Sequence, residues 1–242
     1  ATQVDAALKQ FVNNFTTAVN PQITKSYAQG DLDYMHKLVC RSAKFSAFLM
    51  MFFAVPIILE TNTILTIWLK TVPDYAVIFL QWIIISSFMD TVLANSLVTS
   101  MFATGKIKRY QIIVTTVGCL VFPLSWIAFK LGFEPQVGYI LYFIIYTILL
   151  FVRLYLLKDM VKLPVMMYIR EVLYKLAPII VVGFSIPGIL ILTMDAGWLR
   201  LILVCLLSVL VTAASEYFIG LSNKEKNFVA EKIKLVIGKI KK

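Results

Sequence analysis

Charged and amide side chains recur at helical spacing near the start of this 242-residue chain. Asp5, Lys9 and Asn13 follow one another at four-residue steps, so a helix over Thr2–Val19 carries them on one face. Asp5 and Lys9 can form an ion pair across one turn. This polar face predicts either a helix that borders a water-filled cavity or a surface helix of a soluble or interfacial segment. The apolar segments that follow favour the cavity.

A second polar stripe runs through a segment that is otherwise apolar. From Ser87 to Thr99, small polar residues recur every four positions and include Asn95. Beside them lies Asp90, the acid nearest the middle of a complete apolar segment. An isolated carboxylate at membrane depth is costly, so we expect Asp90 to face a cavity, to have a partner or to be protonated. Small polar residues also join neighbouring helices, but for Asp90 and Asn95 we favour the cavity.

Arg153 lies near the end of another apolar segment, seven residues after Tyr146. Snorkelling of its side chain to the lipid headgroups is the simpler explanation, and contact with an anionic substrate is the alternative. The candidate cavity-lining residues are therefore Asp5, Lys9, Asn13, Asp90, Asn95 and Arg153.

The sequence holds no pattern that is typical of an enzyme. No Ser or Cys nucleophile has a His nearby, and no glycine-rich phosphate loop occurs. The lone His36 and the three cysteines share no metal or redox spacing. We therefore predict a protein without enzymatic activity, cofactor or metal.

The elements that must position the polar residues are long apolar helices. Hydrophobic residues make up 60% of the chain, and about 20 apolar residues are enough to cross a bilayer. We predict an all-α, polytopic transmembrane bundle of about seven helices, formed by Thr2–Val19 and six spans. The predicted spans are Phe45–Leu59, with a helix that starts earlier, Tyr75–Ala103, Tyr110–Phe129, Val137–Leu157, Leu176–Met194 and Leu199–Ile219.

Two further segments complete the predicted organisation. Glu60–Lys70 is too polar at its start to continue a span, so we expect an interfacial helix there. After the bundle of residues 1–220, residues 221–242 alternate apolar side chains with lysines and begin with a capping box, Ser222 to Glu225. We expect this tail to form a basic amphipathic helix on the inner leaflet.

Positive charge is distributed very unevenly between the two sides of these spans. The net charge is +10, and most of the 23 Lys and Arg residues lie in alternate loops and in the tail. The exceptions are Lys9, Lys70, Lys130 and Arg200. By the positive-inside rule, the basic loops and the C-terminus are cytoplasmic. Anionic membrane lipids account for this charge, so we expect no nucleic-acid partner.

The chain begins in the middle of a helical pattern, without an initiator Met or a signal peptide. We expect residues 1–242 to be the C-terminal part of a longer protein.

Several stretches resemble one transporter family. Residues Asn20–Asp31 (NPQITKSYAQGD) close a helix, open a cytoplasmic turn and supply Asp31 as the N-cap of the next helix. Pro56, Ile64–Leu69 (ILTIWL) and Ala103–Lys106 (ATGK) follow at matching places. The chain thus resembles the bacterial polysaccharide flippases, the O-antigen and capsule lipid-linked oligosaccharide translocases of the multidrug/oligosaccharidyl-lipid/polysaccharide exporter superfamily.

The resemblance implies a bundle of 12 to 14 helices in two pseudo-symmetric halves, of which this chain would be the second. It implies alternating access in the bacterial inner membrane, with a polyprenyl-pyrophosphate glycan as substrate. The implied partners are the missing N-terminal half, a polysaccharide polymerase and glycosyltransferases. In this picture Lys9 supplies positive charge for the pyrophosphate, and Asn13 and Asn95 donate hydrogen bonds.

Two other functions remain open. A cation-coupled multidrug exporter of the same superfamily would use Asp90 as its coupling acid. A structural membrane scaffold would use the polar stripes only for helix packing.

Overall fold

The computed structural model describes residues 2–223 and 225–227, and all regular secondary structure among them is helical. The elements are α1 (Thr2–Ala28), α2 (Leu32–Leu59), α3 (Thr61–Leu69), α4 (Ala76–Ser87), η1 (Phe88–Val92), α5 (Asn95–Ala103), α6 (Ile107–Cys119), α7 (Val121–Lys130), α8 (Val137–Val161), α9 (Val165–Tyr168), η2 (Ile169–Leu173), α10 (Tyr174–Thr193), α11 (Trp198–Ser215) and η3 (Glu216–Gly220). The predicted all-α bundle is confirmed.

Six helical segments within the described residues are long and apolar enough to cross a membrane, and each overlaps one of the predicted spans over all but at most one residue of that span. They run over Leu32–Leu59, Ala76–Ala103, Ile107–Lys130, Val137–Val161, Val165–Thr193 and Trp198–Gly220. The helix over 32–59 does start before Phe45, at the N-cap Asp31, whose carboxylate accepts from the Tyr34 N–H at 3.0 Å. The helix predicted within Glu60–Lys70 is present as α3, and its interfacial position stays a prediction.

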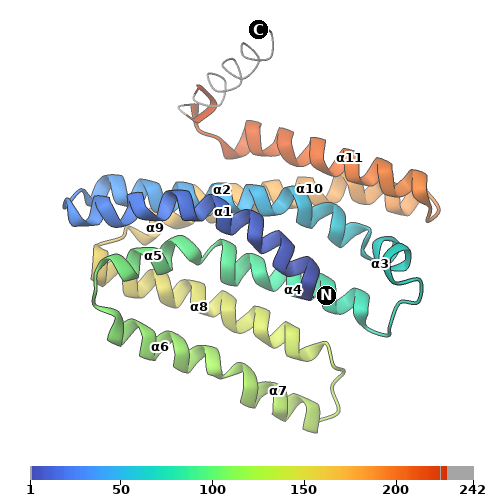
Figure 1. The fold of residues 1–242 in the computed structure, drawn as a ribbon, viewed down its shortest axis with the longest axis horizontal. Helices are drawn as coiled ribbons and strands as arrows, with labels where there is room; N and C mark the ends of the chain where they lie inside the picture. The colour runs from blue at the N-terminus through green and yellow to red at the C-terminus, as the bar shows by residue number, and fades with distance from the viewer. Residues whose placement is uncertain (1, 224, 228–242) are drawn as a thin grey trace.

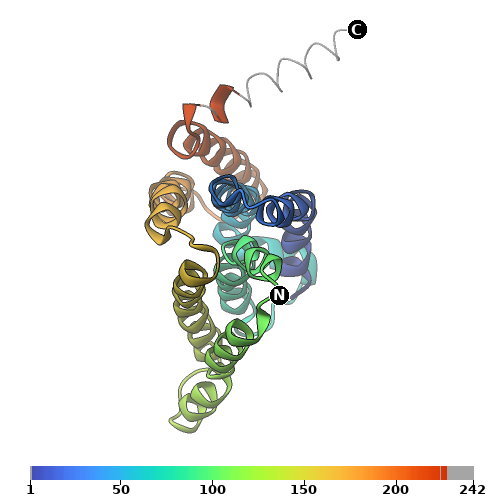
Figure 2. The ribbon, with the colours of Figure 1, turned by 90° about the vertical axis from the view of Figure 1, so that its left-hand side faces the viewer.

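The connections alternate between the two ends of the bundle (Figure 1). The turns α1–α2, α5–α6 and α8–α9 lie at one end, here called the basic end, because it carries the basic loops. The connections α7–α8 and α10–α11 lie with α3 at the opposite end (Figure 1). Viewed from the basic end, α6–α7 and α11 occupy opposite edges, with α1, α2 and α5 between them (Figure 2).

Helix α2 lies at the centre of the packing, in contact with α1, α4, α5, α10 and α11. Its fully buried residues Met35, Ala47 and Val55 fall along its whole length. Helix α1 runs antiparallel to α2 (Figure 1), and Phe11 stacks on Phe53 with ring centroids 4.9 Å apart. A helix of 27 residues is about 40 Å long, so α1 is nearly as long as the 28-residue α2.

The predicted end of the first helix at Asn20-Pro21 is wrong, because α1 continues to Ala28. Proline removes only one backbone donor, and the residues after it are held by packing: Ile23 is fully buried. The chain turns instead at Gly30, whose φ of +76° is the left-handed conformation that glycine adopts without strain.

The predicted helix over Tyr75–Ala103 is also interrupted. A π-helical turn, η1, separates α4 from α5 and contains Asp90. The Tyr168 hydroxyl donates to the Leu93 carbonyl at 2.7 Å, which satisfies a backbone group left free next to the turn. Such turns re-aim the side chains around them and are frequent at functional sites.

At the start of the tail, Glu225 accepts from both the N–H and the hydroxyl of Ser222 at 2.8 Å, so the predicted capping interaction is present from its glutamate side. Residues 224 and 228–242 lie outside the described residues. The amphipathic helix over 221–242 therefore stays a prediction.

Candidate functional site

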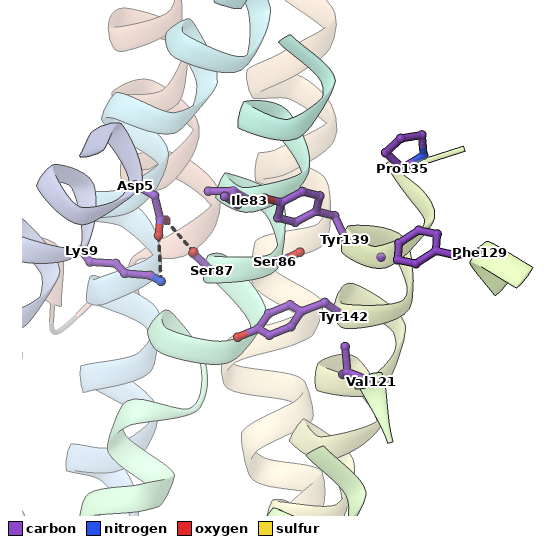
Figure 3. Close-up of a pocket in the computed structure, with 11 residues that line it drawn as sticks. Asp5, Lys9, Ile83, Ser86, Ser87, Val121, Phe129, Pro135, Tyr139 and Tyr142 are labelled. Carbon is purple, nitrogen blue, oxygen red and sulfur yellow. Dashed lines mark hydrogen bonds and ion pairs between the residues drawn. The ribbon is translucent and has the colours of Figure 1, made fainter. Parts of the chain in front are cut away.

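A cavity of about 370 Å³ lies between α1, α4, α7 and α8 (Figure 3). Its polar wall is formed by Asp5 and Lys9 of α1 and by Ser87 of α4. Lys9 Nζ lies 2.8 Å from the Asp5 carboxylate, which also accepts from the Ser87 hydroxyl. Figure 3 shows both partners converging on Asp5, with Tyr139 and Tyr142 on the far side of the space. The predicted ion pair is confirmed, and its lysine remains 30% exposed.

A second cavity, of about 450 Å³, lies closer to the basic end and is lined by Asp90, Asn95 and Arg153. Asn20 of α1 also lines it and donates to Asn95 at 3.4 Å. The Asp90 carboxylate accepts from the Tyr142 hydroxyl at 2.9 Å and lies 3.9 Å from Arg153 Nη2. Asp90 therefore both lines a cavity and has partners, which are two of the three alternatives expected for it.

Tyr142 connects the two cavities. Its ring lines the first, and its hydroxyl bonds to the carboxylate that lines the second. The ring stacks on Tyr146 with centroids 4.1 Å apart, which fixes its position on α8. The two sets of polar residues therefore form one continuous candidate site, defined by Asp5, Lys9, Asp90, Tyr142 and Arg153.

Arg153 does not snorkel, so the simpler sequence interpretation is wrong. Helix α8 continues to Val161, which places Arg153 about 12 Å before its end, and the side chain is only 6% exposed. Its Nε and Nη1 have no hydrogen-bond partner within residues 2–223 and 225–227. Buried donors are normally satisfied, so these two nitrogens can donate to the neighbouring Tyr110 hydroxyl, to water or to a ligand.

Five of the six predicted residues thus line the two cavities, in sets of two and three. Asn13 lines neither of them: it is half-buried, and its backbone carbonyl accepts from the Thr16 and Thr17 hydroxyls. Sequence reasoning missed Tyr142. It precedes Arg153 by 11 residues, three helical turns, so the two share one face of α8.

Among the described residues, two buried ion pairs lie outside the candidate site, one at the end of α2 and one near its middle. Glu60 accepts from Arg200 Nε at 2.8 Å and Nη2 at 3.1 Å, which joins the end of α2 to α11. Near the middle of α2, Lys44 Nζ lies 2.7 Å from Glu225. His36 bonds to the Val161 carbonyl at 2.9 Å, a structural contact.

The described residues include no cluster of three or more His, Cys, Asp or Glu side chains that could hold a metal ion.

Comparison of the chain with family models, with curated proteins and with solved structures finds no match. The resemblance to polysaccharide flippases therefore stays a prediction. The chemical capacity of the site lies in its side chains: two cations with spare donors, two partnered carboxylates and amides that can bind hydroxyl groups.

Proposed function

We propose that this protein is part of a membrane transporter that moves a lipid-linked, pyrophosphate-bearing oligosaccharide across the bilayer by alternating access. The observation that carries the proposal is the pair of polar cavities, connected by Tyr142, between α1 and helices of membrane-spanning composition. Ionisable residues at such depth mark substrate or ion pathways.

The charges of the cavities favour an anionic ligand. Each cavity contains one cation and one carboxylate, so formal charge alone does not discriminate. Donor capacity does: two nitrogens of Arg153 have no hydrogen-bond partner among the described residues, and Lys9, which has three protons to donate, pairs with Asp5. In a partly desolvated site, charge-assisted hydrogen bonds to phosphate are strong, and Asn20 and Asn95 can bind sugar hydroxyls.

The space itself favours transport over a structural scaffold. If the polar stripes only packed helices together, the side chains would fill the interface at the density of a protein interior. Volumes of about 370 and 450 Å³ instead leave room for several water molecules or for a ligand group.

We place the basic end on the cytoplasmic side of a bacterial inner membrane, because the loops there carry most of the basic residues. Reporter fusions after Lys108 and after Glu134 test this orientation, since the two residues lie at opposite ends of the bundle. Identical locations of the two reporters would refute it.

The test of the function is substitution of Lys9 in the intact parent protein. Lys9→Gln removes the charge and should slow flipping of the lipid-linked glycan about tenfold, the loss of about 1.4 kcal/mol of binding. Lys9→Arg should retain most of the rate. Lys130→Gln is the matched control, because Lys130 lies on Trp126 at the end of α7, outside both cavities.

Expression and stability are measured for each variant in parallel with flipping. If Lys9→Gln flips substrate at the normal rate, Lys9 only neutralises Asp5, and the proposal loses its first binding charge. The same outcome for Arg153→Gln would leave no cationic contact in either cavity and would refute the proposal.

One observation favours the cation-coupled exporter as a second candidate. Asp90 lies in the π-helical turn, is 27% exposed to its cavity and is only loosely paired with Arg153 at 3.9 Å. An accessible carboxylate at this depth is the kind of group that couples transport to a cation. In an exporter, Asp90→Asn would abolish efflux of cationic compounds driven by a proton gradient and leave glycan flipping unaffected.

A further inference from the structure

Another cavity, of about 480 Å³, lies at the basic end and is separate from the candidate site. Helix α2, the η2 turn and the segment after η3 form its walls. Its lining is strongly polar and includes Lys37, Arg41, Lys44, Glu171 and Glu225. We call it the basic-end cavity.

Three cations of this cavity lie on one face of α2. Lys37, Arg41 and Lys44 are spaced by four and three residues, so their side chains point in the same direction from consecutive turns. Repulsion between like charges at this spacing is unfavourable unless counter-charges are present. The cluster therefore requires negative charge nearby, and the lining contains two carboxylates, those of Glu171 and Glu225.

Each of these carboxylates already forms a close ion pair with one lysine, and neither of these lysines is Lys37. Glu225 lies 2.7 Å from Lys44, and Glu171 lies 2.6 Å from Lys175. Burial raises the pKa of Glu225, but hydrogen bonds from Lys44 and Ser222 lower it by more, so the pKa lies below its ordinary value and Glu225 is ionised at neutral pH. Glu225 therefore cancels the buried charge of Lys44.

The positive charges of Lys37 and Arg41 remain largely uncompensated. Lys37 has no ion-pair partner among the described residues. Arg41 reaches Glu225 only through Nε at 3.6 Å, and its side chain is 46% exposed. A guanidinium with a free fork beside an ammonium is the donor set that suits a phosphate group.

We propose that the basic-end cavity is a binding site for a phosphate group, held by Lys37 and Arg41, and that an anionic phospholipid headgroup is its source. We infer a lipid headgroup as the source because of the position of Lys37 and Arg41 along the apolar span. Lys37 and Arg41 lie in the first three turns of an apolar span that begins at Leu32, where headgroups meet the protein. Basic pockets between helices at this level bind anionic headgroups.

This site is independent of the proposed transport function, because it shares no residue with the two cavities of the candidate site. Its contact residues are also exposed at the surface of α2, so substitutions there leave the core unchanged. Loss of binding in such a variant can therefore be separated from loss of folding.

The experiment uses the full chain, purified in detergent and titrated with short-chain phosphatidylglycerol or phosphatidylcholine, with bound lipid counted by native mass spectrometry. The wild type should bind phosphatidylglycerol more tightly than phosphatidylcholine. The double variant Lys37→Gln/Arg41→Gln should lose about tenfold of that affinity. The matched control is Lys106→Gln/Lys108→Gln, which removes the same charge from exposed positions at the same end of the bundle.

Unchanged phosphatidylglycerol affinity in Lys37→Gln/Arg41→Gln would overturn the proposal. An equal loss in both double variants would also overturn it, because that result describes a general surface charge and not a site. Inorganic phosphate distinguishes the two sources. If it displaces the lipid from the wild type, free phosphate can also occupy the site; if it does not, the lipid headgroup alone is the ligand.

Discussion

Arg200 and Arg153 each face a carboxylate in this bundle, but their surroundings differ. Arg200 donates to Glu60 through two nitrogens, at 2.8 and 3.1 Å, and its third bonds to the Met194 carbonyl at 3.2 Å. The Glu60 side chain is fully buried. Arg153 approaches Asp90 only to 3.9 Å, and two of its nitrogens have no partner among the described residues.

The difference distinguishes an ion pair that only stabilises the fold from an ion pair whose arginine can still bind a ligand. A bidentate pair whose remaining donors are satisfied has no capacity left for a ligand, and here it ties α11 to the end of α2. A loosely paired arginine beside a cavity keeps its donors for water or substrate. Burial alone does not separate them, since the Arg153 side chain is at least as buried as that of Arg200.

The largest expected effect on stability is at the pair of Glu60 and Arg200. Arg200→Leu leaves the Glu60 carboxylate buried without its cation, so we expect a loss of about 3–5 kcal/mol in the free energy of unfolding. Denaturant-induced unfolding in detergent micelles measures it. The exposed Arg109 is the control: Arg109→Leu should change the free energy by less than about 0.5 kcal/mol.

A double variant sharpens this result. Glu60→Leu together with Arg200→Leu removes both charges, so it should be more stable than Arg200→Leu alone. If the free energy of unfolding of the double variant falls by the sum of the two single losses, Glu60 and Arg200 are not energetically coupled. Arg200 would then not differ from Arg153 in the way proposed.

A smaller loss is expected at the pair of Asp90 and Arg153. Asp90→Asn keeps an oxygen that can accept from Tyr142, and the cavity of about 450 Å³ admits water to Arg153. We therefore expect a loss of about 1 kcal/mol, the value of one hydrogen bond, in the same unfolding assay. A loss as large as that of Arg200→Leu would mean that Asp90 and Arg153 form a tight structural pair, contrary to the proposed ligand role.

The local parts of this structure could be predicted from sequence. The spans follow from apolar composition, the cap at Asp31 from its residue type, and the Asp5–Lys9 pair from four-residue spacing. Each of these features depends on residues close together in the chain. Helical periodicity and transfer free energies are enough to predict them.

The features that escaped prediction depend on packing between distant segments. Asp90 and Tyr142 are 52 residues apart, and Glu60 and Arg200 are 140 apart, so no local pattern links them. The π-helical turn around Asp90 has no proline or glycine to mark it. The burial of Arg153 depends on α8 continuing to Val161, which a basic and polar sequence near Lys158 does not indicate.

The smallest expected effect concerns Glu225, whose buried pair with Lys44 joins α2 to the segment after η3. Because the pKa of Glu225 is lower in the folded protein than its ordinary value of 4.5, its ionised form stabilises the fold. That contribution is fully present above pH 4.5 and is lost as the pH falls through the lower, folded-state pKa. Glu225→Gln should therefore be less stable than the wild type at pH 7.

The stability difference between Glu225→Gln and the wild type should shrink steadily below pH 4.5, in unfolding curves recorded at pH 7, 4.5 and 3.5. Its direction follows from linkage. If the difference stays constant over this range, the Lys44–Glu225 pair is not held by the charge of Glu225.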